Sequence, residues 1–576
     1  MVKPTKRLRT VLLAMAVAAA PMAASAGLAG DYLAARQASF LGDYNAAATY
    51  YGRALESDAE NPELLERAVL ANISVGDVGL AADLGADLAA MGLRSQLAQM
   101  AMVTQDAANQ NYQAVLDAIA EERGLGPLAD GLIAAWAQLG VGDMSAALVG
   151  FDTVAQRQGL GPFSMYQKAL ALASVGDFES ADAILTGDAG GLAMTRRGLI
   201  AHAQVLSQLD RYDDAVALID SAFGADLDPA LSALRAALLA GEPVRFSQIT
   251  SARDGMAEVF YTLSGALSNE DNDDLTLLYA RMAQHLRPDH VDAILLAAEQ
   301  LERLGQYALA VDAYGGVPSD HPAFHAAEMG RAEALRSQGQ SDAAIAVLRG
   351  LTETHGDIAS VHSALADTLR QVERYAEASV SYTDALDRIE EVGPNQWFLF
   401  YARGITFERE GNWPAAEADF RQALELNPGQ PQVLNYLGYS LVEKRIKLDE
   451  ALDMIERAVA AQPDSGYIVD SLGWVLYRLG RYEEAVVHME RAAELMPVDP
   501  VVNDHLGDVY WAVGRHLEAE FQWKRALSFA DWGDAAEDVD QDRIRRKLEV
   551  GLDAVLAEEG AEPLRLAEES GADNGN

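Results

Sequence analysis

The residues that could do chemistry are few and scattered in this 576-residue chain. The sequence has no cysteine, which excludes disulfides, thiolate metal sites, iron–sulfur clusters and cysteine nucleophiles. It also has no glycine-rich phosphate loop, no HExxH zinc motif, no Gly-x-Ser-x-Gly nucleophile motif and no EF-hand loop. We therefore expect no enzymatic activity, no cofactor and no bound metal.

Two short clusters are the strongest chemical candidates. His321 and His325 have the i, i+4 spacing of a helical metal site, with Glu328 nearby. Pro322, however, marks a helix start, which places His321 outside the helix and argues against a metal site. The run of basic residues at 543–547 is typical of a nucleic-acid-binding patch, but acidic residues flank it closely. We interpret that run as a solvated helix face.

The charge of the chain limits its partners. The sequence has 44 Lys+Arg against 87 Asp+Glu, for a formal net charge of −43. Such an acidic surface repels phosphate backbones and anionic lipid headgroups, so we expect neither nucleic acid nor a membrane surface as a partner. Half of the residues are hydrophobic, which excludes a disordered chain and leaves folded, protein-binding functions.

The N-terminus has the pattern of a cleavable secretory signal. Four basic residues within 1–9 precede an apolar stretch over 11–20, and Ala-Ser-Ala at 24–26 supplies a small-x-small cleavage site. The apolar stretch is well short of the ~20 residues that span a bilayer, and a lipoprotein anchor would need a cysteine. We expect cleavage after Ala26, a periplasmic location in a Gram-negative bacterium and no stable membrane anchor.

A repeated element organises the rest of the chain. It consists of Gly-x-aromatic, an alanine, an aromatic or aliphatic residue four positions later and often another alanine, as in Gly480, Tyr482, Ala485, Met489 and Ala492. The residue in the first alanine slot recurs mostly every 34 residues, at Ala47, Ala81, Val115, Ala147, Ala181, Ala215, Thr276, Ala310, Ala344, Ala378, Ala416, Ala451, Ala485 and Ala519. This pattern resembles the tetratricopeptide repeat (TPR), which implies an all-α solenoid of helical hairpins with about fourteen repeats in two arrays.

The repeat spacing also divides the chain into segments. It breaks between Ala215 and Thr276, where the chain has one helical stretch, Asp228–Leu239, and then a Gly-Glu-Pro sequence. This break is either a decayed repeat or a joint, and the clustered glycine and proline favour a joint. We predict a signal peptide over 1–26, an N-terminal TPR array over 27–223, an irregular joint or degenerate repeat over 224–256, a C-terminal TPR array over 257–530, a capping helix over 531–558 and an acidic disordered tail over 559–576.

The concave groove of the C-terminal array is the candidate protein-binding site. Gly404, Gly438, Gly473 and Gly507 recur where two helices must approach closely. If they hold the eighth position of the repeat, the TPR resemblance implies that the second, fifth, ninth, twelfth and thirteenth positions point into the groove. The candidate site residues are Phe398, Tyr401, Arg409, Asn435, Tyr439, Asp470, Trp474, Tyr477, Arg478, Asp504, Asp508 and Trp511.

These groove residues predict the chemistry of a partner. Aromatic rings with interleaved carboxylates and amides suit peptide binding, although any single ring could equally pack between helices. The TPR clamps that hold a terminal carboxylate need Lys, Arg and Asn at the inner positions, whereas here Asp470, Asp504 and Asp508 hold several of them. We therefore expect other proteins or peptides as partners, bound through basic or apolar segments.

A narrower resemblance covers about the last 130 residues. The runs Leu-Gly-Tyr-Ser-Leu at 437–441, Asp-Ser-Leu-Gly-Trp-Val-Leu-Tyr-Arg at 470–478 and His-Leu-Gly-Asp-Val at 505–509 are similar to large envelope TPR proteins of proteobacteria. That family includes the lipoprotein adaptor of a periplasmic carboxyl-terminal processing protease, whose substrates are peptidoglycan cross-link hydrolases. The resemblance implies an envelope scaffold that presents such substrates to the protease, although this chain has no cysteine for a lipid anchor.

Two other functions stay open. One is a structural component of an envelope assembly or of a polysaccharide or outer-membrane export complex. The other is an enzyme with a site at the irregular segment over 224–255, which requires that this segment form a polar pocket.

Overall fold

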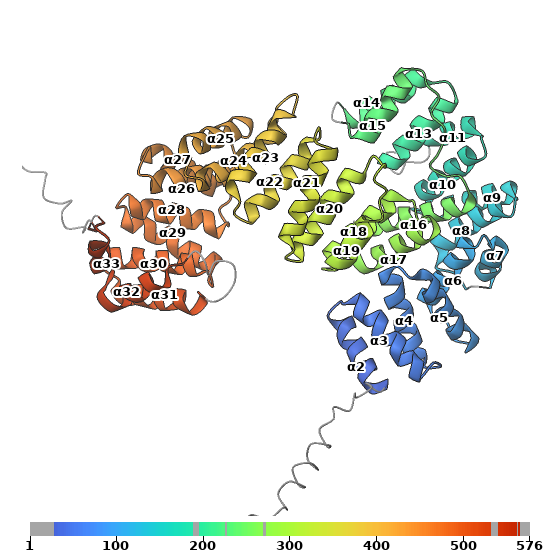
Figure 1. Cartoon of the computed structure of the whole chain (residues 1–576), viewed down its shortest axis with the longest axis horizontal. Helices are drawn as coiled ribbons and strands as arrows, with labels where there is room; N and C mark the ends of the chain where they lie inside the picture. Colours follow the sequence, from blue (N-terminus) through green and yellow to red (C-terminus); the bar gives the residue numbers. More distant parts are fainter. Residues whose placement is uncertain are drawn as a thin grey trace, which may run out of the picture. The chain divides into compact units, whose positions relative to one another are not determined.

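The structure, a computed structural model, describes residues 28–121, 123–187, 195–224, 227–268, 272–530, 539–561 and 563–564. Within these ranges every regular element is a helix, which confirms the predicted all-α fold class (Figure 1). The predicted signal peptide over 1–26 and most of the predicted tail lie outside the described residues. In the part of the chain that is described, no helix is both long and apolar enough to cross a membrane.

The chain divides into two compact units, Met1–Glu353 and Thr354–Asn576. The first unit contains helices that pack mainly as consecutive antiparallel pairs. They are α2 (Leu28–Phe40), α3 (Tyr44–Ser57), α4 (Pro62–Val75), α5 (Val78–Ala90), α6 (Gln96–Ala108), α7 (Tyr112–Ala120), α8 (Pro127–Gly140), α9 (Met144–Ala155), α10 (Gly161–Ser174), α11 (Phe178–Thr186), α13 (Arg196–Gln208), α14 (Tyr212–Phe223), α15 (Pro229–Leu239), α16 (Ala252–Leu267), α17 (Asp273–Leu286), α18 (Val291–Arg303), α19 (Tyr307–Tyr314), α20 (Phe324–Ser337) and α21 (Ser341–Thr354).

The second unit continues the same hairpin pattern. Its elements are α22 (Ala359–Gln371), α23 (Tyr375–Asp387), the 3-10 turn η2 (Pro394–Gln396), α24 (Trp397–Arg409), α25 (Trp413–Leu426), α26 (Pro431–Glu443), α27 (Leu448–Ala461), α28 (Gly466–Arg478), α29 (Tyr482–Leu495), α30 (Pro500–Ala512), α31 (His516–Phe529), α32 (Gln541–Val550) and α33 (Leu552–Glu558). Each helix packs most closely against its neighbour in sequence, as in α28 with α29 and α30 with α31.

The predicted alanine slot marks the core of every hairpin. All fourteen residues in that slot, from Ala47 to Ala519, are at most 2% exposed. They lie in the second helix of each pair, where a small side chain allows two helix backbones to approach closely. The repeat spacing found in the sequence is therefore the packing period of the structure.

The turn between the two helices of a hairpin requires a left-handed backbone conformation. Gly411 and Gly480 adopt it with φ of +78° and +76°, at no steric cost because glycine has no Cβ. Gln110, Asp210 and Glu373 adopt the same conformation with φ between 57° and 60° in three other hairpins. The turn geometry is thus set by the repeat and not by glycine alone.

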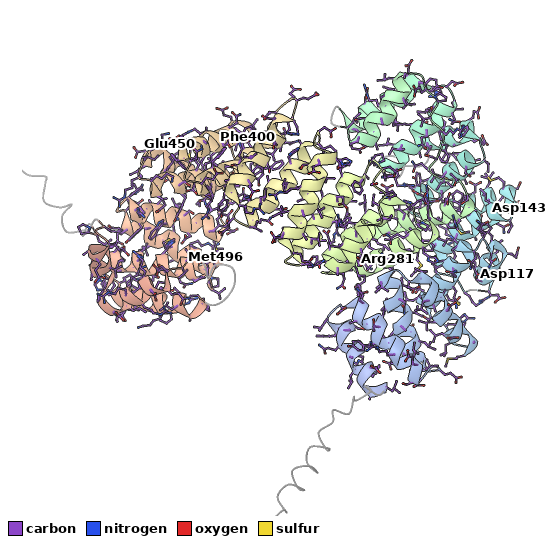
Figure 2. The ribbon with its side chains drawn as sticks, viewed as in Figure 1. Asp117, Asp143, Arg281, Phe400, Glu450 and Met496 are labelled. Carbon is purple, nitrogen blue, oxygen red and sulfur yellow. The ribbon has the colours of Figure 1, made fainter. Side chains whose placement is uncertain are left out.

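The helix pair α16–α17 packs against earlier helices of the first unit. α16 lies on α8 and α10, and α17 lies on α4 and α6. Trp136 of α8 is fully buried beside Gly255, and its Nε1 donates to Gln167 Oε1 at 2.8 Å. Arg281 of α17, labelled in Figure 2, is also buried, and its Nε donates to the carbonyl of Ser74 in α4 at 3.3 Å. The α16–α17 pair therefore packs on the face that α4, α6, α8 and α10 present.

The irregular segment contains the predicted helix and a connector. α15 coincides with the predicted helical stretch, and Asp228 caps its N-terminus by accepting hydrogen bonds from the backbone N–H groups of Ala230 and Leu231. Residues 241–250, which we call the connector, form no regular element. The border between the two compact units lies after Glu353 and not in the predicted joint over 224–256, and the array boundaries stay a prediction.

The C-terminal cap differs from the single capping helix predicted over 531–558. It consists of two helices, α32 and α33, separated at Gly551, whose φ of +86° ends the first helix. Residues 531–538 of the predicted capping segment lie outside the described residues. Glu559, the first residue of the predicted tail, pairs with Arg543 of α32 at 2.8 Å, and Leu564 packs against the core of the second unit.

Candidate functional site

The first helices α24, α26, α28 and α30 carry the predicted groove residues. A methyl group added at Gly404, Gly438, Gly473 or Gly507 would lie closer than van der Waals contact to the facing second helix. At Gly438, for example, such a Cβ would lie 2.7 Å from Ile455 Cγ1 and 2.9 Å from the carbonyl of Ala451. The predicted packing role of these glycines is confirmed, and it fixes the register of the groove-facing side chains.

Trp474 of α28 contacts two other predicted site residues, Tyr477 and Arg478. Its ring stacks on Tyr477 at 4.9 Å between centroids and on His505 of α30 at 4.0 Å. Its Nε1 donates to Glu443 Oε1 at 3.1 Å, and Arg478 donates to the same carboxylate at 3.0 Å. An aromatic and ionic cluster thus bridges three consecutive hairpins.

Asp470 lies at the other side of this cluster. One carboxylate oxygen is 3.0 Å from His505 Nδ1, and both residues are largely buried. Burial disfavours the charged imidazole, but Asp470 and the more distant Asp504 and Asp508 outweigh it and raise the pKa of His505 above its ordinary value. The Asp470 carboxylate is therefore already paired with a side chain that the chain itself supplies.

Asp504 and Asp508 of α30 hold a lysine from the C-terminal cap. Lys547 of α32 is fully buried, and its Nζ lies 2.9 Å from Asp504 and 2.6 Å from Asp508. The same Nζ lies 5.7 Å from the centre of the Trp523 ring, whose Nε1 donates to Asp508 at 2.9 Å. We call Asp504, Asp508 and Trp523 the lysine cage. The expected solvated face at 543–547 is wrong for Lys547, because the cage buries its amine.

Trp511 is covered by the cap as well. Its Nε1 donates to Asp553 of α33 at 2.9 Å, and its ring stacks on His516 at 4.1 Å between centroids. Gly551, the residue between α32 and α33, lies so close that an added Cβ would be 2.6 Å from the Trp511 ring. The predicted groove of the last hairpin is thus occupied by the chain's own C-terminal segment.

The remaining predicted residues lie on α24 and α26. Tyr401 packs edge-on against Tyr436 at 5.9 Å, and burial raises the pKa of Tyr401 to about 12. Burial lowers the pKa of the Arg409 guanidinium, but Tyr436 and other nearby acidic groups outweigh it and raise the pKa. Asn435 is buried, and its Oδ1 has no hydrogen-bond partner among the described residues.

Two aromatic side chains remain available at this end. Phe398 on α24 is 47% exposed, and Tyr467 on α28 is 46% exposed. Tyr439 of α26 is partly buried, and this burial raises its pKa. The structure therefore leaves the side chains of Phe398 and Tyr467 accessible and packs the cap against α30.

Sequence reasoning from the groove positions alone missed His505, Trp523 and Lys547. His505 is next to a predicted site residue, and Trp523 is on a second helix, where the repeat pattern predicts core. The basic run at 543–547 drew attention to Lys547 in the sequence. Its partners could not be found there, because Asp508 and Asp504 lie 39 and 43 positions away. As predicted, His321 lies outside the helix that contains His325, because α20 begins at Phe324.

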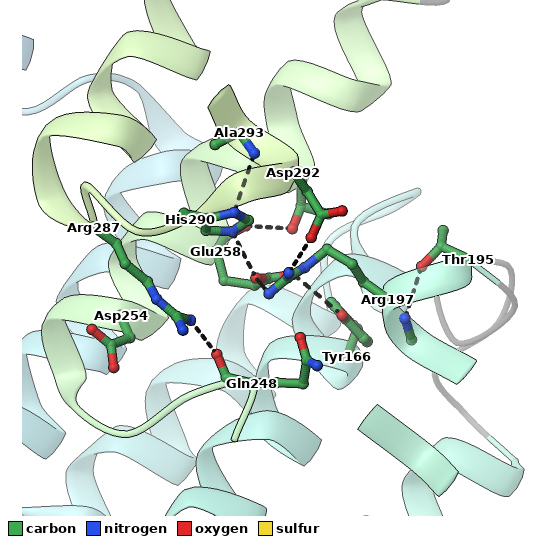
Figure 3. Close-up of polar contacts among 12 residues, drawn as sticks. Tyr166, Thr195, Arg197, Gln248, Asp254, Glu258, Arg287, His290, Asp292 and Ala293 are labelled. Carbon is green, nitrogen blue, oxygen red and sulfur yellow. Dashed lines mark hydrogen bonds and ion pairs between the residues drawn. The ribbon is translucent and has the colours of Figure 1, made fainter. Parts of the chain in front are cut away.

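The first unit contains a separate polar cluster (Figure 3). Arg197 of α13 forms ion pairs with Glu258 of α16 at 2.6 Å and with Asp292 of α18 at 2.5 Å. His290 and Tyr166 also contact Glu258. Burial alone would raise the pKa of Glu258, but the charge of Arg197 outweighs it and the pKa is lowered. The cluster borders a cleft beside the irregular segment, and both apolar and charged side chains line this cleft.

Sequence profiles described as tetratricopeptide repeat match residues 295–358, 401–465 and 469–497. These segments are tetratricopeptide repeats. The TPR repeat-containing protein PA4667 of Pseudomonas aeruginosa is 27% identical over 193 residues, which are 33% of this chain and 31% of that protein. The chain thus matches about a third of the length of this curated relative.

Several solved structures match this chain at low sequence identity and low TM-score. The Cut9–Hcn1 hetero-tetramer of the APC/C matches with a TM-score of 0.36 and 15% identity, over 93% of this chain and 99% of that chain. Yeast Tom70 matches with a TM-score of 0.34 and 14% identity, over 91% and 97%. YrrB, described as a TPR protein with an unusual peptide-binding site, matches with a TM-score of 0.26 and 19% identity, over 33% and 96%.

Proposed function

We propose that this TPR chain is an exported protein-binding scaffold of the bacterial cell envelope, whose C-terminal groove binds basic segments of other proteins. One observation carries the choice of ligand. The groove carboxylates Asp504 and Asp508 enclose a lysine amine with an aromatic ring beside it. Carboxylates with an adjacent aromatic face are suited to a lysine or arginine side chain.

The accessible part of the groove extends the same chemistry toward α24. Phe398 and Tyr467 offer exposed aromatic area, and the carboxylate of Glu443 accepts hydrogen bonds from Trp474 and Arg478. The net charge of −43 attracts basic partners over a longer range and increases their rate of encounter.

The sharper form of the proposal is an adaptor that presents cell-wall hydrolases to a periplasmic carboxyl-terminal processing protease. It rests on the narrow resemblance at 437–441, 470–478 and 505–509, and export rests on the signal pattern over 1–26. The alternative is a structural component of an envelope assembly or export complex, which would form a stable complex of fixed stoichiometry.

Affinity purification of the mature protein from its native envelope tests this proposal, first at low salt and then at about 0.5 M salt, which screens exposed charges. We compare the wild type with the groove variant Phe398→Ala/Tyr467→Ala. The matched control is Val487→Ala/Phe521→Ala, whose side chains are 66% and 60% exposed on the second helices α29 and α31.

The outcomes separate the two forms. Recovery of a protease with a hydrolase, weakened by the groove variant and by salt but not by the control, supports the adaptor. Recovery of a fixed set of components that resists salt and is the same for the wild type and the groove variant supports the assembly alternative. Recovery of no protein above an unrelated bait contradicts the scaffold itself.

A further inference from the structure

Helix α32 of the cap is a basic segment in an acidic chain. Its run Arg-Ile-Arg-Arg-Lys at 543–547 contrasts with the net charge of −43 of the whole sequence. Arg545 and Arg546 pair with acids of the cap itself. Arg543 and Lys547 reach the carboxylates of α30. The chain therefore carries, in its own cap, a segment of the class that we propose as the ligand of the groove.

The contact of α32 with α30 has the features of a bound basic ligand. The Nζ of Lys547 lies 2.9 Å from Asp504 and 2.6 Å from Asp508, and Nη1 of Arg543 lies 3.5 Å from Asp508. Ile544, three positions before Lys547, is fully buried in the core of the second unit. Residues three apart lie on one face of a helix. α32 is thus held through an aliphatic side chain and a lysine on the same face.

The second helix of the cap covers the next predicted groove residue. Asp553 of α33 accepts a hydrogen bond from Trp511 Nε1 at 2.9 Å, and Gly551 lies against the same ring. With the cap in place, the side chains of Asp504, Asp508 and Trp511 are all engaged by residues of α32 and α33. A partner that is to use these three side chains must replace the cap.

The cap is the least buried part of the second unit. Only two residues of α32 and two of α33 are buried, whereas every other described α-helix of this unit has at least three. Elements with few buried side chains open more readily than the rest of a native protein. The cap is therefore the part of this unit that leaves its place most easily.

Exchange of the cap for a partner conserves the charge pairing. When the cap leaves, Lys547 and the carboxylates of Asp504 and Asp508 all gain water, so no charge stays buried without a partner. A lysine of the incoming segment then forms the same ion pairs, beside the same ring of Trp523. An aliphatic residue one helical turn earlier takes the place of Ile544.

We propose that α32 is a built-in competitor for the C-terminal groove, displaced by a helical segment of a partner that carries an aliphatic residue three positions before a lysine. This inference rests on the proposed function, to which it adds the state in which the chain holds its own site. Without a partner, the cap closes the lysine cage to other cations. Binding of a partner there releases the cap.

The test uses the full-length protein and a labelled peptide that copies residues 540–550, with binding measured by fluorescence anisotropy. A second peptide differs only in having Gln in place of the lysine. The protein variant is Lys547→Ala, which empties the cage. Its control is Arg546→Gln, which removes a positive charge of α32 that pairs with Glu549 and Glu558 of the cap.

We expect Lys547→Ala to bind the lysine peptide about tenfold or more tightly than the wild type, because its internal competitor is weakened. The glutamine peptide should bind this variant about tenfold or more weakly than the lysine peptide, as expected for a lost charged hydrogen bond. Arg546→Gln should match the wild type within about twofold. Equal affinity of wild type and Lys547→Ala, equal affinity for the two peptides, or no binding by Lys547→Ala would each overturn the proposal.

Hydrogen exchange of the wild type gives a second test that does not depend on the folding of Lys547→Ala. The lysine peptide is added above the ~mM effective concentration of a tethered segment. It should speed exchange of the amides of α32 and α33 and leave α22 and α23 unchanged, whereas the glutamine peptide should have no effect. Unchanged exchange in the cap would overturn the proposal. The proposed function is tested separately, by the purification with Phe398→Ala/Tyr467→Ala, which leaves the cap sequence intact.

Discussion

Lys547 and Asp508 face each other across the last hairpin of the second unit, with Nζ 2.6 Å from the carboxylate and both side chains at most 2% exposed. Lys547 belongs to the cap, whereas Asp508 is one of the residues predicted to line the groove. The pair therefore links the stability of the C-terminus to the residues proposed for ligand binding.

Lys547→Met should destabilise the second unit by about 3–5 kcal/mol, because Asp504 and Asp508 would stay buried without their cation. Tryptophan fluorescence in urea measures this unit, since six of the seven tryptophans lie between 397 and 532. The control is Lys524→Met, whose side chain is 63% exposed and pairs with Glu520. It should cost less than about 1 kcal/mol. Equal losses in both variants would show that the buried pair has no special role.

The ion pair of His505 predicts a pH dependence. Although burial disfavours the charged ring, Asp470 and its acidic neighbours raise the pKa of His505 above 6.5. A raised pKa in the folded state stabilises the fold fully below pH 6.5, and this stabilisation is lost as the pH rises through the raised value.

Unfolding of wild type and His505→Gln from about pH 6 to about pH 9 isolates this effect, since titration common to both proteins cancels in the difference. We expect the stability advantage of the wild type to shrink as the pH rises. A difference that is constant over this range would mean that the pKa of His505 is the same in the folded and unfolded states.

Glu258→Gln should destabilise the first unit by about 3–5 kcal/mol, because it leaves the guanidinium of Arg197 buried without its main counter-charge. The lowered pKa of Glu258 means that the wild-type advantage is present above the ordinary value of 4.5 and is lost as the pH falls below it. Hydrogen exchange of α16 is the readout. The control is Asp152→Asn, which removes the charge of a half-exposed carboxylate paired with Lys168. This variant should leave the hydrogen exchange of α16 unchanged.

Gly438→Ala tests the close approach of α26 and α27. The added methyl would lie 2.9 Å from the carbonyl of Ala451, which is backbone and cannot turn away. We expect a loss of about 1–3 kcal/mol in urea unfolding followed by tryptophan fluorescence. Gly429→Ala, where nothing lies within 4 Å, should change stability by less than about 1 kcal/mol. A neutral Gly438→Ala would show that the two helices are not in tight contact.

The repeat pattern predicted the fold because packing imposes it locally. Every hairpin needs a small residue where its helices cross, so Ala416 and Ala485 could be recognised from their spacing, and Gly438 and Gly473 could be assigned to the facing helix. A helix such as α15 was visible from its own apolar pattern and from Asp228 at its start. These signals lie within one repeat, which is why they could be read from the sequence.

The features that sequence reasoning missed depend on distant residues. Nothing near Lys547 shows that Asp504 and Asp508 enclose it, and the flanking acids favoured a solvated face instead. The break at Gly551 was likewise hidden, because a single glycine is tolerated inside many helices. The packing of α16 on Trp136 depends on Gly255, more than a hundred positions away.

The central claim is that the C-terminal groove binds basic segments of other proteins. Its most direct test is to place a photo-crosslinking residue at Tyr467 in the groove and, as a control, at Phe521 of α31, and to irradiate the native envelope. We predict that position 467 links to proteins through peptides rich in lysine and arginine and that position 521 does not. Crosslinks of equal yield at both positions, or linked peptides without basic residues at 467, would contradict the claim.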